Sequence, residues 1–169
     1  MITDKEIQKI VEWADEKKVV GKSWKKAKWG SNLFGDDIYS VKKGIPRDKE
    51  TLLKITHLNL SKAKLSNIPL ELYKLTQLQD LDISNNSIST LSKEIGNLIN
   101  LEYLNLSENR VLSKKNGYYD FSITSEIKNL KKIKVLNLSN LDLKVIPQEI
   151  WKIESLTNLG LELGSEGII

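Results

Sequence analysis

The chain contains no cysteine among its 169 residues. This absence excludes disulfide frameworks, thiolate zinc sites and cysteine nucleophiles. Long apolar runs are missing too. The first residues, MITDKEIQKIVEW, mix charged with single apolar side chains, and no later run is long enough to cross a bilayer. We therefore expect a cytoplasmic protein without a membrane span, although export by a route that reads no N-terminal signal would leave no trace in these residues.

Aromatic side chains and excess charge are both scarce. Aromatic residues make up 7% of the chain against 40% hydrophobic residues, so leucine and isoleucine dominate and favour a thin, stacked core. The net charge is +4, and residues 1–50, with 12 basic and 9 acidic side chains, carry +3 of it. The length predicts one structural domain. An excess charge this small argues against general binding of nucleic acid.

From Ile55 onward, apolar residues recur in the pattern L-x-x-L-x-L, which restarts at a fixed distance. Two apolar residues at period two point to one face of a short strand, and one unit alone cannot bury that face. We therefore expect stacked units with parallel strands. The repeat units are residues 55–77, 78–100, 101–132 with an insertion, 133–155, and a truncated 156–169.

This pattern resembles the leucine-rich repeat family, whose units of about 20–29 residues match the spacing from residue 55 to about 163. The resemblance implies an α/β fold, a right-handed solenoid with about five short parallel strands on its concave face. The family places an asparagine after the strand. The two central units have it as Asn86 and Asn109, whereas the outer units have Ala63 and Leu141, so we expect less regular outer turns.

Residues 1–54 are predicted to form a helical N-terminal cap, similar to those of small bacterial leucine-rich repeat proteins, because stacked units expose an apolar edge at each end. Thr3 and Glu6 match a capping box and start a helix over residues 4–18. Asp48 is placed to start a second helix. No polar closing unit follows the last strand. Either residues 168–169 cover that edge, or a second copy shares it in a homodimer.

The third unit is nine residues longer than the others and contains the segment SKKNGYYDFSI. Asn116 and Gly117 suit a turn, with β-favouring residues behind them, so we expect a two-stranded finger. Alternation predicts that Tyr119 and Phe121 face the body and that Tyr118 is exposed. Insertions in repeat proteins often lie on the binding face. Simple packing of these aromatic rings against the solenoid is an equally supported alternative.

The outward positions of the expected strands form a small polar platform with one aromatic residue near its centre. A rigid platform lowers the ordering cost of binding, which suits protein recognition. We therefore expect a non-enzymatic module that binds a protein partner, which the sequence does not identify. The predicted contact residues are His57, Asn59, Asp80, Asp82, Tyr103, Asn105, Val135 and Asn137, together with Tyr118 and Tyr119 of the finger.

Catalytic and metal-binding groups are few. His57 is the single histidine, and we expect no serine or acid beside it, so a solvated surface residue is favoured over a general base. Asp80, Asp82 and Glu102 lie on outward positions of neighbouring strands. A solvated acidic patch is preferred over a metal site there, because hard cations usually take their ligands from a folded loop. No cofactor is expected.

One stretch supports a different function. GKSWKKAKWG, residues 21–30, holds four lysines and two tryptophans without an acid, a combination that can bind phosphates and stack on bases. The alternative function is therefore a nucleic-acid-associated protein. The preferred interpretation is that the tryptophans pack on the cap while the lysines stay in water. The residues of this patch are Lys22, Trp24, Lys25, Lys26, Lys28 and Trp29.

Overall fold

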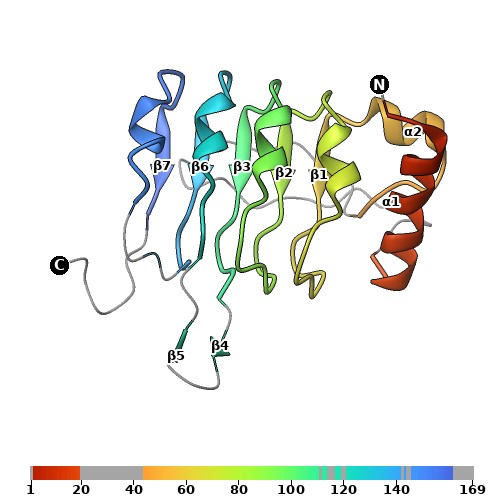
Figure 1. Cartoon of the computed structure of the whole chain (residues 1–169), viewed down its shortest axis with the longest axis horizontal. Coiled ribbons are helices and arrows are strands. Elements are labelled where there is room, and N and C mark those ends of the chain that lie inside the picture. Colours follow the sequence, from red (N-terminus) through yellow and green to blue (C-terminus); the bar gives the residue numbers. More distant parts are fainter. Residues whose placement is uncertain are drawn as a thin grey trace.

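The computed structural model describes residues 2–19, 44–110, 112–113, 117–118, 121–141, 143 and 146–161. Within them, five short strands form one parallel sheet. Each strand lies beside the strand of the preceding repeat unit (Figure 1). In sheet order the strands are β1 (His57–Asn59), β2 (Asp80–Asp82), β3 (Tyr103–Asn105), β6 (Val135–Asn137) and β7 (Asn158–Gly160).

The strand register follows the sequence period. Residues 23 apart pair between neighbouring strands, as His57 does with Asp80, and the 32-residue unit shifts the next partner of Tyr103 to Val135. The central leucine of each of the first four strands points into the core. These residues, Leu58, Leu81, Leu104 and Leu136, are each at most 1% exposed. The predicted buried row is confirmed, and with it the stacking of the units.

Four 3-10 helices run opposite the strands and close the other side of the core (Figure 1). Each unit has room for only one or two turns there, a length at which the 3-10 form is common. Each helix inserts one aliphatic side chain, namely Leu72, Ile95, Ile127 or Ile150, and all four are at most 1% exposed. The helices are η1 (Leu70–Lys74), η2 (Lys93–Asn97), η3 (Ser125–Asn129) and η4 (Ile150–Lys152).

Helix α1 (Asp4–Glu16) covers the N-terminal end of the solenoid (Figure 1). Thr3 and Glu6 form the predicted capping box, and the buried stripe includes Ile7, Ile10 and Ala14. The helix ends two residues earlier than predicted, because Lys18 has a φ of 53°, in the left-handed region that terminates helices.

Ion pairs link helix α1 to the first unit. Lys9 Nζ lies 2.7 Å from a Glu71 carboxylate oxygen, and Lys74 pairs with Glu6. The bond from Lys74, assisted by the Thr3 amide and hydroxyl, lowers the pKa of Glu6 from 4.5 to about 2. These pairs are exposed, so they fix the orientation of α1 more than they stabilise the fold.

Helix α2 (Lys49–Lys54) leads the chain into β1. It starts at Asp48 as predicted, and the Asp48 carboxylate accepts from the Thr51 amide at 2.8 Å. Just before this helix, Gly44 donates its amide to Asn59 O at 2.7 Å and so covers part of the free edge of β1.

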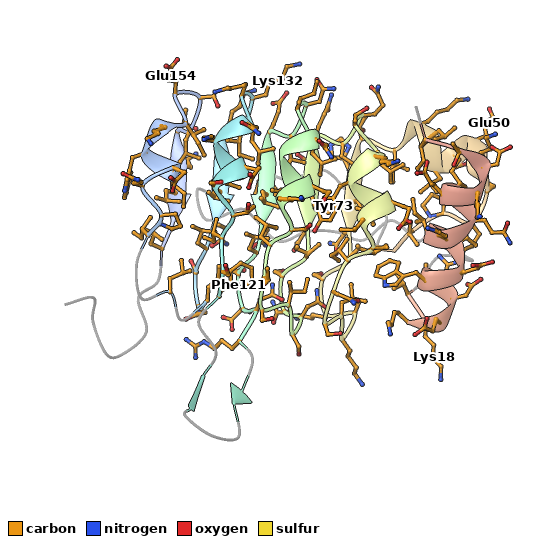
Figure 2. All side chains as sticks on the ribbon, in the orientation of Figure 1. Lys18, Glu50, Tyr73, Phe121, Lys132 and Glu154 are labelled. Carbon is orange, nitrogen blue, oxygen red and sulfur yellow. The ribbon has the colours of Figure 1, made fainter. Side chains whose placement is uncertain are left out.

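The insertion forms the predicted finger. Strands β4 (Leu112–Ser113) and β5 (Gly117–Tyr118) pair antiparallel and project away from the sheet (Figure 1). Gly117 lies in β5 opposite Ser113, so it belongs to a strand and not, as expected, to the turn. Phe121 is 5% exposed and faces the body as predicted (Figure 2). Tyr119 lies outside the described residues.

At the other end of the sheet, β7 is the last described strand. Its neighbouring apolar side chains Leu156, Leu159 and Leu161 are only partly buried. Residues 162–169, on which the predicted cover of this edge depends, lie outside the described residues. Homodimerisation through the C-terminal edge therefore stays a prediction.

Candidate functional site

The first residue of each strand in the sheet points away from the core and is partly exposed. Neighbouring strands in a sheet lie about 4.8 Å apart, so these side chains form a continuous line across the units. We call this line the outer row. Its members are His57, Asp80, Tyr103, Val135 and Asn158.

Within the outer row, His57 is held on both sides. Its Nε2 atom lies 2.7 Å from Asp80 Oδ2, and its Nδ1 atom lies 2.7 Å from Thr56 Oγ1. The expectation that no acid lies beside His57 is therefore wrong, because the 23-residue register itself places Asp80 next to it. Burial raises the pKa of the Asp80 carboxyl, and Glu102 adds to this effect while His57 opposes it.

A hydroxyl, an imidazole and a carboxylate linked by hydrogen bonds also form the triad of many hydrolases. A triad works with backbone amides aimed at the point where an oxyanion develops. Near Thr56, the amides of Gln79 and Asp80 donate instead to Thr56 O, at 2.7 and 3.0 Å. These amides are committed to the sheet, and the group fixes the orientation of His57.

Tyr103 lies next to Asp80 near the middle of the row. Its partial burial raises the pKa of the phenol to about 12, and the carboxylates of Asp82 and Asp80 contribute. The side chain is therefore a neutral hydrogen-bond donor at physiological pH. A half-buried tyrosine with limited freedom is a common anchor in protein interfaces.

The third residue of each strand has a structural role. We call these residues, Asn59, Asp82, Asn105 and Asn137, the inner row. In each case a side-chain oxygen accepts from the amide two positions later, Ser61, Ser84, Ser107 or Ser139, at 2.8 to 3.1 Å. Such turns end a strand by replacing ladder bonds with a side-chain bond.

This role limits what the inner row offers a partner. Asn59, Asp82 and Asn105 are 5%, 3% and 8% exposed, whereas we expected them to face outward and be accessible. Asn137 is partly exposed but makes the same bond. The structure thus places all eight predicted strand residues in two lines and leaves the outer row as the accessible one.

The two family asparagines act between units. Asn86 Oδ1 accepts from the amides of Ala63 and Leu65, both at 3.0 Å, and its Nδ2 donates to Leu60 O at 3.0 Å. Asn109 repeats the arrangement one unit later, where its Oδ1 accepts from Ile88 N at 3.1 Å. Both side chains thus satisfy backbone groups on the turns of neighbouring units.

The acidic positions considered for a metal are tied to other groups. Glu102 lies 2.6 Å from Lys134 Nζ, and Asp82 holds the Ser84 amide. Across the described part of the chain, no group of three or more His, Cys, Asp or Glu residues is placed to hold a metal ion. The same residues contain no helix long and apolar enough to cross a membrane.

The structure does not describe the side chains of two sets of predicted residues. Tyr118 is described only as part of the β5 backbone. The alternative nucleic-acid patch, from Lys22 to Trp29, lies wholly outside the described residues. Sequence reasoning in turn missed Thr56 and the pairing of Glu102 with Lys134, although the repeat register brings Glu102 and Lys134 together.

A family model described as leucine rich repeat matches residues 53–111. The chain therefore carries leucine-rich repeats over residues 53–111. A leucine-rich repeat protein of Leptospira interrogans shares 27% identity over 69% of this chain, with a TM-score of 0.50. A TDR receptor shares 34% identity over 65% of this chain, with a TM-score of 0.54. An internalin, inlF of Listeria monocytogenes, shares 23% identity over 65%, with a TM-score of 0.51, a likeness of fold alone.

This leucine-rich repeat chain is short beside those structures. It spans 35% of the Leptospira chain, 31% of the internalin and 18% of the receptor. A search of curated proteins found no match. Leucine-rich repeat proteins are generally protein-interaction modules, and the match supports that broad role for this chain.

Proposed function

We propose that this leucine-rich repeat chain is a non-enzymatic module that binds a protein partner through the outer row and the finger. The observation that carries the proposal is the outer row itself. His57, Asp80, Tyr103 and Val135 lie side by side on rigid strands and remain partly exposed. Side chains fixed in this way lose little entropy when a partner docks.

The outer row also changes character along its length. The pair of His57 and Asp80 offers charge and hydrogen bonds at one end, and Val135 offers an apolar contact beyond Tyr103. A polar end beside an aromatic anchor supports recognition of a specific folded or extended protein segment. The finger belongs to the same unit as Tyr103, so we expect one partner to reach both surfaces.

The test begins with capture of partners from the native host by the immobilised chain, and identification of each by mass spectrometry. Affinity is then measured by calorimetry for the wild type, for Tyr103→Ala and for Tyr118→Ala. We expect each variant to bind at least about tenfold more weakly, as interface tyrosines typically do. Lys131→Ala is the matched control, because Lys131 is exposed on a turn outside the outer row.

Melting curves separate binding from packing. The double variant Tyr103→Ala and Tyr118→Ala is expected to melt close to the wild type while binding weakly. A large loss of stability with unchanged affinity would instead assign these rings to packing and refute the proposal. A cytoplasmic location belongs to the proposal as well, and fractionation of host cells tests it.

A further inference from the structure

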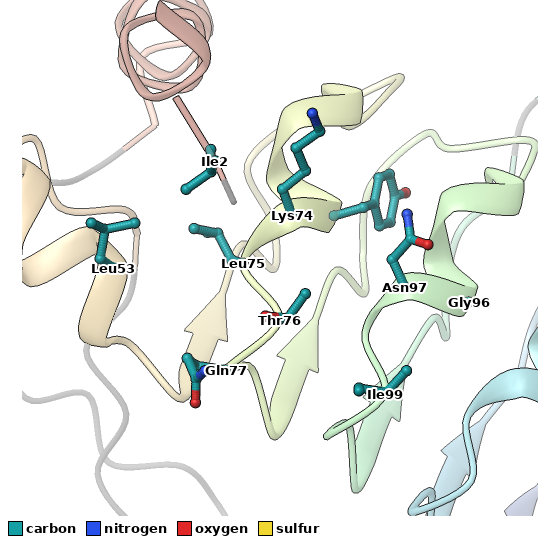
Figure 3. A pocket seen from close by; sticks show the side chains of 10 residues that line it. Ile2, Leu53, Lys74, Leu75, Thr76, Gln77, Gly96, Asn97 and Ile99 are labelled. Atoms are coloured by element: carbon teal, nitrogen blue, oxygen red, sulfur yellow. The ribbon is translucent and has the colours of Figure 1, made fainter. Parts of the chain in front are cut away.

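An open pocket of about 550 Å³ lies where the cap meets the first two units, on the side of the 3-10 helices (Figure 3). Ile2 and Leu53 line it from the cap, Leu75 from the end of η1, and Ile99 from the segment after η2. A volume of this size falls within the range of about 300–1,000 Å³ that is typical of small-molecule sites.

Ile99 is an apolar residue at a repeat position that is polar in the other units. The corresponding residues of the other units are Thr76, Lys131 and Glu154, as expected for a surface turn. Ile99 is nevertheless 56% exposed, with its side chain at the pocket. Stacking of the units needs no apolar residue here, so the pocket gives a specific reason for this one.

Gly96 and Tyr73 depart from the repeat in a second way. They hold the same repeat position in neighbouring units, where the third and fourth units have Lys128 and Trp151. Both residues line the pocket, although a β-carbon on Gly96 would point at η3, 3.0 Å from Asn129 Nδ2 and 3.1 Å from Glu126 O. Tyr73 lies between the first two units in Figure 2 and is 2% exposed.

The Tyr73 hydroxyl has no hydrogen-bond partner among the described residues. It is nevertheless not among their fully enclosed unpaired atoms, of which Trp13 Nε1 is the example, so the hydroxyl retains some exposed surface, and Tyr73 lines the pocket. Burial raises the pKa of the phenol, and Glu94 adds to the effect, so the group remains a donor. A hydroxyl that has no protein partner at a pocket offers its hydrogen to a bound acceptor.

Charge around the pocket points to a neutral ligand. Lys74, the cation at the rim, already pairs with Glu6. Glu94 acts on the Tyr73 phenol in the direction that disfavours a further negative charge. An anionic ligand would have to compete for a cation that is already paired, whereas an uncharged acceptor needs only the phenol.

We propose that this pocket binds a small uncharged carbonyl compound with a compact aliphatic group. The carbonyl oxygen accepts from the Tyr73 hydroxyl, and the aliphatic group packs against Ile99 and the apolar side chains of the cap. The site is separate from the outer row, and its ligand is independent of the proposed protein partner.

The experiment is an NMR titration of the whole ¹⁵N-labelled chain with N-acetyl-leucine methylamide at millimolar concentrations. We expect amide shifts concentrated in residues 73–77 and 96–99. Two matched probes test the chemistry. N-acetylglycine methylamide lacks the aliphatic group and is expected to bind about tenfold more weakly. N-acetyl-leucine keeps that group but carries a carboxylate, and is also expected to bind more weakly.

Two variants test the residues. Tyr73→Phe keeps the ring and removes the donor, and we expect about fivefold weaker binding, the effect of one hydrogen bond. Ile99→Thr introduces the residue that the first unit has at this position, Thr76. We expect this variant to fold normally and to bind the probe more weakly. Trp151→Ala is the control, since it holds the repeat position of Tyr73 far along the array. Absence of shifts in the two segments, or equal affinity in both test variants, would overturn the proposal.

Discussion

Gly160 lies directly opposite Asn137 in the pairing of β7 with β6, and the space that a side chain would need is already filled. A β-carbon on Gly160 would lie 2.7 Å from Asn137 Oδ1 and 3.1 Å from its Cγ. Asn137 cannot simply turn away, because its Oδ1 holds the Ser139 amide at 3.0 Å. In β7, the last described strand, glycine thus stands where the earlier strands carry asparagine or aspartate.

The substitution Gly160→Ala is accordingly expected to lower the free energy of unfolding by about 1–3 kcal/mol, the usual cost of overpacking. Urea denaturation followed by circular dichroism measures it. In the double variant with Asn137→Ala, the obstructing oxygen is gone. The double variant should therefore lose less unfolding free energy than the sum of the losses of the two single variants. Strict additivity would show that the contact with Asn137 is not the cause.

The central leucine row gives a second prediction. Leu104 is fully buried between Leu81 and Leu136, so Leu104→Ala leaves a cavity and is expected to cost about 2–5 kcal/mol of unfolding free energy. The same denaturation experiment measures the loss. Lys131→Ala, at an exposed site, should stay within about 0.5 kcal/mol of the wild type. A tolerated Leu104→Ala would contradict the stacked core.

Asn109 supports a third prediction. Its side chain accepts from Ile88 N and donates to Ile83 O and Leu106 O, all in the buried interior. Asn109→Ala leaves these three groups unpaired, and because each unpaired buried group costs about 1–3 kcal/mol, we expect a loss of at least about 3 kcal/mol. Thermal melting checks it. Asn100→Ala, which removes the exposed bonds to Thr76 O and from Lys132 Nζ, is the control and should cost clearly less.

The cap gives a prediction about pH. The pKa of Glu6 is lowered from 4.5 to about 2, chiefly by Lys74. A carboxyl with a lowered pKa in the folded state stabilises the fold above pH 4.5, and this contribution is lost as the pH falls from 4.5 towards 2. Carboxyl ¹³C NMR should find the Glu6 midpoint near 2 in the wild type and distinctly higher in Lys74→Met.

The control for this titration is Lys54→Met, which removes an exposed lysine of the same region that pairs with Glu50. It should leave the Glu6 midpoint unchanged. An ordinary Glu6 midpoint in the wild type would mean that the bond from Lys74 does not persist in solution.

Much of the fold follows from the sequence because the period alone sets the register. Once residues 23 apart stack, Leu58 and Leu81 must share one core, and the strands must be parallel. The end of α1 was less predictable. The apolar stripe stops at Ala14 and does not fix the end point, whereas the left-handed conformation of Lys18 ends the helix, and no glycine marks that position.

The candidate site was predicted in position but not in exposure. Alternation gives the direction of a side chain, so it placed Asn59 and Asp82 outward together with the outer row. It does not show that an oxygen folds back onto an amide two residues later. The recurrent Asn or Asp followed two positions later by serine, as in Asn59 and Ser61, was the available signal. The pocket needs the cap placed against the units, which no local pattern specifies.

The asparagine bonds between units also set an order for biosynthesis. The amides of Ala63 and Leu65 and the carbonyl of Leu60 find their partner in Asn86, which leaves the ribosome more than twenty residues later. The second unit depends on Asn109 in the same way. A nascent chain can therefore finish each coil only after part of the next has been translated, so folding during synthesis must trail elongation by about one coil.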